Sequence, residues 1–317
     1  MTGLQEADIL QAARWFASSP ASLSLYCQGL NQSAHGTHNN AGIIHLHLAT
    51  GQIGKPGAGP FSLTGQPNAM GGREVGGLAN LLSAHRDLAN PAHRAEVAQL
   101  WGVPSVPDKP GKSAVDLFKS LKSGEIKAVW IACTNPAQSL PNQAAVREAL
   151  QTAEYVVLQE AYRNTDTAAY ADLLLPASGW GEKYGTVTNS ERCITRVAAA
   201  IPPPGEARHD WEIVVDFARR LGKKLNHADV ERLFPYIDPQ GIFNEHREST
   251  RGRDLDITGL SYDLLAALGP QQWPFPEGAT AGRQRLYEDG VFPTADGRAR
   301  FVPIQHLPTA DVLTPQF

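Results

Sequence analysis

The sequence predicts an α/β protein: a doubly wound, mostly parallel sheet in a three-layer arrangement, with an irregular, proline-rich C-terminal extension. Short apolar, β-branched runs alternate with helical patterns between residues 127 and 176, and polar turns separate them. This alternation implies right-handed crossovers and a parallel sheet. With 317 residues, 42% of them hydrophobic and 19% charged, the chain has enough material for one large or two ordinary domains.

Charge and cysteine content exclude several classes of protein. A formal net charge of -4 argues against a nucleic-acid-binding surface. The three cysteines are too far apart for a CxxC pair and too few for a disulfide framework, which indicates a reducing compartment. The first 19 residues resemble an acidic amphipathic helix rather than a signal peptide, and no apolar run approaches the ~18 residues of a membrane span. We expect a cytoplasmic protein without nucleic-acid or membrane partners.

The expected elements follow from apolar spacing and from the residues that cap helices. In the first part, helices are expected over residues 6–19 and 39–50, a strand over 23–27, and a helix over 91–101 with Asn90 as its cap and Pro91 at its first position. Residues 53–77 are glycine-rich and show no periodicity, so they are expected to form a long functional loop.

The second part begins with a linker over residues 104–112 and a helix over 113–123 capped by Ser113. Strands are expected over 127–133, 155–159 and 172–176, with a helix over 143–151 between the first two. Residues 182–192 are polar, 193–201 fit an extended edge, and 210–221 fit an amphipathic helix that ends at Gly222. The predicted regions are therefore 1–103, the linker, 113–222 and an irregular or helical extension over 223–317.

Polar side chains follow three of the expected strands: Gln28 and Gln32, then Asn135, then Gln159 and Glu160. The carboxyl ends of strands in a doubly wound sheet share one edge, where ligands bind. An amide or carboxylate there is placed to hold a ribose hydroxyl or a guanine edge. Ordinary turn chemistry is the better explanation for any one of these residues alone, and the two explanations are equally good for the three strand ends together.

The glycine-rich segment contains neither GxxxxGK[ST] nor a GxGxxG directly after a strand, which argues against a P-loop or an ordinary NAD site. Its glycines permit close approach to a flat cofactor, and polar residues lie among them, but a flexible surface loop is equally consistent. On spacing alone, Lys183 fits a surface charge and Asp210 a helix cap. The histidines lack metal-binding spacing, and we find no GxSxG motif or neighbouring Cys/His pair.

Five stretches, in order, resemble the molybdopterin oxidoreductases of the dimethyl sulfoxide reductase type. They are QGLNQSAHGTHNN, TGQIGKPGAGPFSLTGQPNAMGGREVGG, TNPAQSLPN, YADLLLPASGWGEKYGTVTNSER and PPGEARHDWEIVVDFARRLG. The sequences of these stretches are most similar to those of bacterial nitrate reductase catalytic subunits, and TRGRDLDITGLSYDLLAALGPQQWPFPEGA resembles their assimilatory, cytoplasmic branch. The family uses molybdenum bis-(molybdopterin guanine dinucleotide).

The resemblance implies a cofactor-binding role for ten positions. For Lys183, the lysine of WxEKxG, it favours cofactor binding over a surface charge, and for Asp210 it favours cofactor binding over a helix cap. A lysine ammonium suits a pyrophosphate or pterin, and a carboxylate suits a guanine N–H edge. The family often has an aspartate where this chain has Gln159 and Glu160. The ten positions are Gln28, Gln32, Gly65, Gln66, Arg73, Asn135, Gln159, Glu160, Lys183 and Asp210.

The chain also departs from the family pattern. Catalytic subunits begin with a cysteine cluster for a [4Fe–4S] centre, and a cysteine ligates molybdenum in these nitrate reductases, but Cys27, Cys133 and Cys193 match neither. Cys133 and Cys193 are interpreted as small buried residues. We expect an internal piece of a longer enzyme, without the iron–sulfur region, the metal ligand or the C-terminal capping domain.

The resemblance implies reduction of nitrate to nitrite by oxygen-atom transfer, with no catalytic residue contributed by this chain, which would be inactive alone. Its partners would be the remaining domains, nitrate, and an electron donor such as ferredoxin, flavodoxin or a reductase subunit. Two alternatives are a formate dehydrogenase-like enzyme and a non-catalytic scaffold derived from the family.

Overall fold

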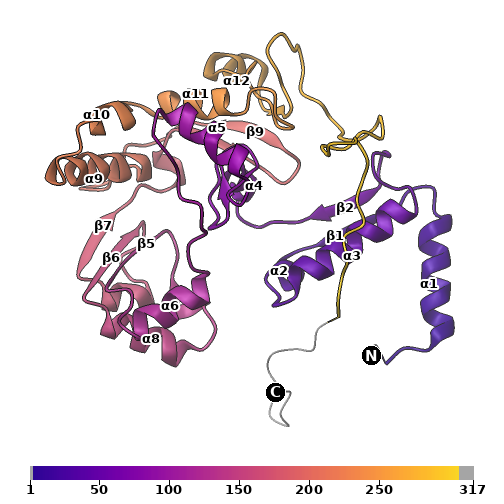
Figure 1. The fold of residues 1–317 in the computed structure, drawn as a ribbon, viewed down its shortest axis with the longest axis horizontal. Coiled ribbons are helices and arrows are strands. Elements are labelled where there is room, and N and C mark those ends of the chain that lie inside the picture. Colours follow the sequence, from indigo (N-terminus) through magenta and orange to yellow (C-terminus); the bar gives the residue numbers. More distant parts are fainter. Residues whose placement is uncertain (1–2, 307–317) are drawn as a thin grey trace.

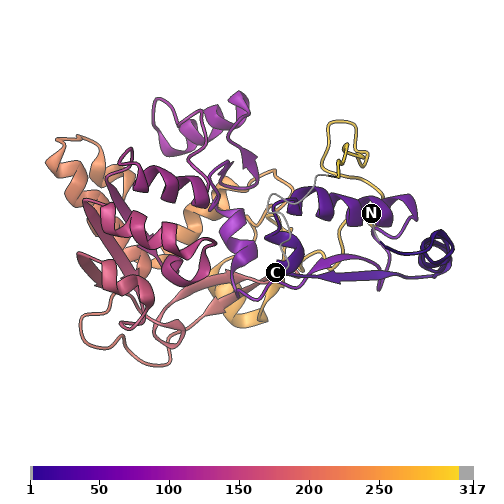
Figure 2. The ribbon, with the colours of Figure 1, turned by 90° about the horizontal axis from the view of Figure 1, so that it is seen from below.

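The computed structural model describes residues 3–306 of the chain. Its elements form four small sheets surrounded by helices, and the α/β class predicted from the sequence is confirmed (Figure 1). The elements around the first sheet are set apart from the rest of the molecule in both views, and the chain leaves them after β2 (Figure 2). None of the helices within residues 3–306 combines the length and apolar character that a membrane crossing requires.

The amino-terminal part packs a helix against a pair of parallel strands. Strands β1 (Leu23–Tyr26) and β2 (Gly59–Ser62) pair in parallel, and the buried His47 of α3 lies 2.8 Å from the hydroxyl of Ser24 on β1. The chain returns here at its other end, because the backbone N–H of Val302 donates to His45 of α3 at 3.1 Å. The helices are α1 (Glu6–Ser18), α2 (Gln28–Asn31) and α3 (Gly36–Ala49).

The glycine-rich segment is more ordered than the sequence predicts. Residues 53–77 contain β2 and the short helix α4 (Ala69–Glu74), so the expectation of a loop without helix or strand is wrong. This secondary structure depends on contacts with distant segments, and the spacing of apolar residues along the chain does not indicate such contacts. The hairpin β3 (Leu81–Leu82) and β4 (Arg86–Asp87) follows, and then α5 (Pro91–Trp101), where the side chain of Asn90 accepts from the N–H of Ala92 as its capping role predicts.

A parallel sheet of order β5-β6-β7 forms the second part, as predicted. Its apolar core includes Ile131, Val156 and Leu158, with Val146 and Leu150 of α8 packed against them. Helix α9 lies toward Trp130, whose ring centroid is 4.8 Å from that of Phe217. The elements are α6 (Ala114–Lys122), β5 (Ala128–Ala132), α7 (Pro136–Ser139), α8 (Gln143–Thr152), β6 (Tyr155–Glu160), η1 (Asp166–Tyr170), β7 (Leu173–Pro176) and α9 (Asp210–Lys224).

Two expectations for this part are wrong. Helix α9 continues through Gly222 to Lys224 instead of ending at the glycine. The glycine makes room for Val230, since a Cβ at position 222 would lie 2.3 Å from its Cγ2. The polar stretch 182–192 contains β8 (Gly185–Thr188), after η2 (Trp180–Glu182). Strand β9 (Cys193–Val197) is the middle strand of the antiparallel sheet β10-β9-β8 rather than an edge, because β10 (Gln271–Gln272) pairs with its other side.

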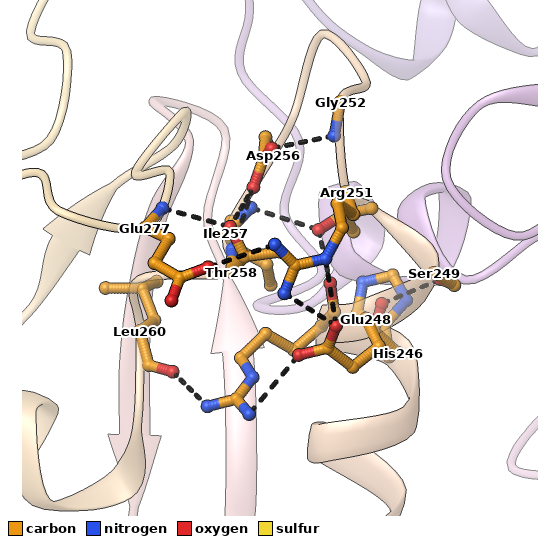
Figure 3. A network of polar contacts seen from close by, with 12 residues as sticks. His246, Glu248, Ser249, Arg251, Gly252, Asp256, Ile257, Thr258, Leu260 and Glu277 are labelled. Atoms are coloured by element: carbon orange, nitrogen blue, oxygen red, sulfur yellow. Dashed lines mark hydrogen bonds and ion pairs between the residues drawn. The ribbon is translucent and has the colours of Figure 1, made fainter.

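Up to residue 306, the C-terminal extension is partly helical and partly irregular, and it supplies most of the second core. Buried Phe243, Leu260 and Phe275 pack with Ile194 of β9. A polar network secures the loops here: Arg251 pairs with Glu248 at 2.8 Å and with Glu277 at 3.0 Å (Figure 3). The helices are α10 (Val230–Leu233), α11 (Pro239–Ser249) and α12 (Tyr262–Leu268).

Candidate cofactor site

Four side chains meet at the carboxyl ends of β5 and β6. Asp210 accepts on Oδ2 from Lys183 Nζ at 2.9 Å, and on Oδ1 from Gln159 Nε2 at 2.8 Å and Cys133 Sγ at 3.5 Å. We call these residues the sheet-edge group. The structure therefore brings together three of the predicted positions, Gln159, Lys183 and Asp210, from segments that are far apart in the chain.

The local fold explains how each member reaches this place. Gln159 is near the end of β6, and its carbonyl accepts from the N–H of Cys133 at 2.9 Å. Cys133 follows β5 with a φ of +57°, a left-handed conformation that turns the chain out of the sheet. Lys183 follows η2, and its Nζ lies 5.3 Å from the centre of the Trp180 ring.

Asp210 occupies the first turn of α9, where a carboxylate is favourable. The cap position belongs to His209, which corrects the interpretation of Asp210 as the cap; the backbone N–H of His209 donates to Glu212 at 3.2 Å. The helix therefore begins one residue earlier than the acid suggests, which frees the Asp210 side chain to face the group.

The charges of the group are arranged around one carboxylate. Partial burial raises the pKa of Asp210, but hydrogen bonds from Lys183 and Gln159 outweigh it and bring this pKa below its usual value. Partial burial, followed by the nearby Asp210 carboxylate, raises the pKa of the Cys133 thiol to about 11. Cys133 is therefore a neutral hydrogen-bond donor at neutral pH. As a residue it is exposed, so the expectation of a buried cysteine is wrong; Cys193 is half-buried.

Gln159 leaves one polar atom without a partner. Its side chain is buried, with 2% exposed, and the amide nitrogen bonds Asp210, while Oε1 has no hydrogen-bond partner among residues 3–306. A buried acceptor without a donor is unfavourable, and native structures rarely tolerate one unless water or a ligand supplies the donor. The group therefore offers an unused acceptor, a carboxylate and a cation to a ligand, a donor set that fits a nucleotide-type cofactor.

Asn135 and Glu160 stabilise turns in this structure, because their side chains accept hydrogen bonds from groups in neighbouring segments. The Asn135 side chain accepts from the N–H and the hydroxyl of Thr167 at 3.0 and 2.7 Å, which ties the loop after β5 to η1. One oxygen of Glu160 accepts from the N–H groups of Ala161 and Tyr162 at 2.8 and 3.3 Å. Both residues border the sheet-edge group and shape the loops around it.

The other predicted positions gather near the ends of β1 and β2. Gln28 of α2 donates to Gln66 at 3.1 Å. Next to it, Asn31 donates to Ser62 at 2.9 Å and accepts from Asn40 at 3.2 Å. We call Gln28, Asn31, Asn40, Ser62 and Gln66 the amide group.

Sequence reasoning missed Asn31 and Asn40. The signal for Asn31 was its position beside the predicted Gln28 and Gln32, and the signal for Asn40 was the polar run HGTHNN at the start of a helix. Asn40 Oδ1 is also a buried acceptor for which the described part of the chain supplies no donor. Gln32 and Gly65 are exposed close by, and a Cβ on Gly65 would meet no atom within 4 Å.

Four polar residues in the second half of the glycine-rich segment divide into two pairs. Gln66 and Arg73 are exposed, and Gln66 belongs to the amide group. Asn68 and Glu74 point inward to Thr188 of β8, and Glu74 is buried with 3% exposed. Within the described residues, no set of three or more His, Cys, Asp or Glu is arranged to hold a metal ion.

A family model for molybdopterin oxidoreductases matches residues 9–220, more than half of the chain. The chain therefore belongs to the molybdopterin oxidoreductase family. A nitrate reductase of Synechocystis sp. is 46% identical over 305 residues, which are 94% of this chain and 42% of the relative.

Two further relatives define the breadth of the likeness. An assimilatory nitrate reductase catalytic subunit of Bacillus subtilis is 38% identical over 309 residues, 97% of this chain and 42% of the relative. Formate dehydrogenase H of Escherichia coli is 30% identical over 319 residues, 100% of this chain and 42% of the relative. The chain thus spans less than half the length of these curated relatives.

Proposed function

We propose that this chain is the cofactor-binding portion of a molybdenum nitrate reductase and holds bis-(molybdopterin guanine dinucleotide). When bound, the cofactor supplies the oxygen-atom transfer that converts nitrate to nitrite, and the residues of this chain bind and orient it. Nitrate is favoured over formate because the nitrate reductases are 46% and 38% identical to the chain, against 30% for the formate dehydrogenase.

The observation that carries the proposal is the buried Oε1 of Gln159, which has no partner within residues 3–306 and lies beside the Lys183–Asp210 ion pair. The edge of a guanine or pterin ring presents N–H donors, which suit Gln159 Oε1 and the Asp210 carboxylate. A pyrophosphate presents negative charge, which suits the Lys183 ammonium. We assign Gln159, Lys183 and Asp210 to direct cofactor contact, and Asn135 and Glu160 to the loops that shape the site.

The amide group would hold a second part of the same cofactor. Its side chains offer amide donors and acceptors, and the exposed Arg73 lies close enough to the end of β1 to lower the pKa of Tyr26, although burial raises that pKa overall. We assign Gln28, Gln32, Gly65, Gln66 and Arg73 to the pterin side. In this role they position the cofactor, while no residue of this chain acts as acid, base or nucleophile.

The remaining functions belong, in this proposal, to the part of the longer enzyme outside this chain. That part would supply the [4Fe–4S] centre, the molybdenum ligand and the capping domain, and it would receive electrons from ferredoxin, flavodoxin or a reductase subunit. The chain alone would then bind cofactor without reducing nitrate. A cytoplasmic location is proposed from the likeness to the assimilatory relative.

The test is the Lys183→Ala substitution in the full-length enzyme, with molybdenum content and nitrate reduction as the measurements. Lys127→Ala is the matched control, because Lys127 also forms an ion pair, with Glu154 at 2.8 Å, on an exposed surface away from the group. We expect Lys183→Ala to lose most of its molybdenum and Lys127→Ala to retain it. Full molybdenum and normal activity in Lys183→Ala would refute the assignment, and a wild-type protein without cofactor affinity would indicate the scaffold alternative.

A further inference from the structure

Helix α4 lies between the two halves of the proposed site. Just before it, Gln66 accepts from Gln28 of the amide group. At its two ends, the side chains of Asn68 and Glu74 both bond Thr188, the last residue of β8, with the N–H of Thr188 donating to Asn68 at 2.9 Å. The segment therefore contacts the amino-terminal elements on one side and the antiparallel sheet on the other (Figure 1).

Glu74 makes the more demanding of these two contacts. Its Oε2 accepts from the hydroxyl of Thr188 at 2.9 Å, and its Oε1 accepts from the indole N–H of Trp273. Its backbone carbonyl also accepts from the N–H of Ala84 at 2.7 Å. Because the carboxyl is buried and both side-chain donors are neutral, losing either donor would leave a desolvated polar atom. These bonds therefore hold the Glu74 carboxyl in one position.

Strand β8 connects this contact to the sheet-edge group. Lys183 lies two residues before β8, and Thr188 is its last residue. The strand is held by its register with β9, in which Thr188 faces the buried Ile194. The pairing fixes the backbone separation of Gly185 from Thr188, at roughly 3.3 Å per residue, and Lys183 precedes Gly185 by only two residues.

We infer that Glu74 is a positioning residue: by fixing α4 to the end of β8, it sets the separation between Gln66 and Arg73 on one side and the Lys183–Asp210 pair on the other. The inference rests on the proposed function, since it treats both groups as contacts to one cofactor. A ligand of fixed dimensions binds well only when its two contact groups are held at matching positions.

Three substitutions and one control separate this role from general stability. Glu74→Ala removes both acceptors, and Thr188→Val removes one donor at nearly constant volume. Glu74→Gln keeps an acceptor for Trp273 and offers an amide donor to the Thr188 hydroxyl. The control is Thr250→Val, because Thr250 is buried and its hydroxyl bonds Ile257 and Arg247, which belong to neither α4 nor β8.

Two measurements on the 317-residue chain test the inference. The first is hydrogen exchange, without cofactor, at the amides of Gly72 and Val75, which bond Asn68 and Gly71 in α4. The second is the affinity for molybdopterin guanine dinucleotide cofactor extracted anaerobically from a purified family enzyme. We expect Glu74→Ala and Thr188→Val to accelerate exchange and weaken binding about tenfold, as the loss of one buried hydrogen bond implies.

Glu74→Gln should keep both α4 amide exchange and cofactor affinity near their wild-type values, and Thr250→Val should lower only the melting temperature. Unchanged α4 exchange in Glu74→Ala and Thr188→Val would overturn the inference, as would a Thr250→Val variant that loses cofactor affinity equally. If the wild-type chain binds no cofactor, the proposed function fails; the exchange experiment, made without cofactor, still reports separately on whether Glu74 fixes α4.

Discussion

Lys183 and Asp210 form an ion pair in which each oxygen of the carboxylate has its own partners. Lys183 bonds Oδ2 at 2.9 Å, while Gln159 and Cys133 bond Oδ1. The residues are 27 positions apart and meet because η2 places Lys183 opposite the first turn of α9. One carboxylate thereby orients an ammonium, an amide and a thiol.

The stability of the protein should depend on Asp210 in acid. Although burial raises the pKa of Asp210, hydrogen bonds from Lys183 and Gln159 lower it below its unfolded value of about 3.9. The folded state therefore binds this proton less readily, and the stabilisation is complete above pH about 4 and disappears as pH falls through the folded pKa.

Asp210→Asn removes this dependence. We expect the variant to melt at a lower temperature than wild type at pH 6 to 7, and the difference to shrink steadily below pH about 4. Thermal melts of both proteins across this range measure it. A gap that widens in acid would contradict the assignment of Asp210 as the ionised partner. Because the pair is partly exposed, high salt should reduce the gap.

The reactivity of Cys133 should respond in opposite directions to its two charged neighbours. The Asp210 carboxylate contributes to raising the thiol pKa to about 11, and the Lys183 ammonium opposes it. Asp210→Asn should therefore accelerate alkylation of Cys133 by iodoacetamide at pH 8, and Lys183→Ala should slow it, because the thiolate is the reactive form.

Mass spectrometry after timed alkylation follows each cysteine separately. Cys27, whose thiol donates to the carbonyl of Leu63 far from this group, provides the internal control. Equal changes at Cys27 and Cys133 would indicate general loosening of the fold. The same sign of change in both variants would show that the charges do not act on the thiol.

The parallel sheet could be predicted because its information is local. The strand predicted over residues 127–133 from its apolar, β-branched run contains β5, which is shorter by one residue at each end. Asn90 and Ser113 are caps whose side chains accept from N–H groups two or three residues later, so a short window of sequence determines them. Gln159, Lys183 and Asp210 could be proposed together only through the resemblance to a family.

The features that the sequence did not indicate depend on distant partners. Strand β8 is polar and β-branched, and its pairing with β9 decides its structure. Helix α4 contains two consecutive glycines, and contacts with Thr188 and Trp273 hold it, 114 and 199 positions from Glu74. No periodicity of neighbouring residues reports such contacts, and the same holds for the direction in which Asn68 and Glu74 point.

The protonation of Glu74 gives a second, opposite dependence on pH. Burial raises the pKa of Glu74, despite the opposing hydrogen bonds from Thr188 and Trp273. The folded state therefore holds this proton at higher pH than the unfolded chain, so its contribution to stability declines as pH rises from about 4.3 through the folded pKa. Glu74→Gln lacks this decline. Denaturant titrations should show the free energy of unfolding of the variant rising relative to that of wild type over this pH window. A constant difference between the two free energies would mean that Glu74 does not titrate there.

Gly222 supports a test of packing in which two effects have opposite signs. Within a helix, alanine is intrinsically better than glycine by about 1 kcal/mol. A Cβ at position 222, however, would lie 2.3 Å from Cγ2 and 2.7 Å from Cβ of Val230, so α10 or α9 must shift. Overpacking of this kind costs about 1–3 kcal/mol, and we expect Gly222→Ala to lower the free energy of unfolding by about 1 kcal/mol net. Combining it with Val230→Gly removes every Val230 side-chain atom from this contact, so in that background the helix preference should make alanine favourable at position 222. Urea denaturation of the two single variants and the double variant completes the cycle, and simple additivity would show that Gly222 is not selected by its contact with Val230.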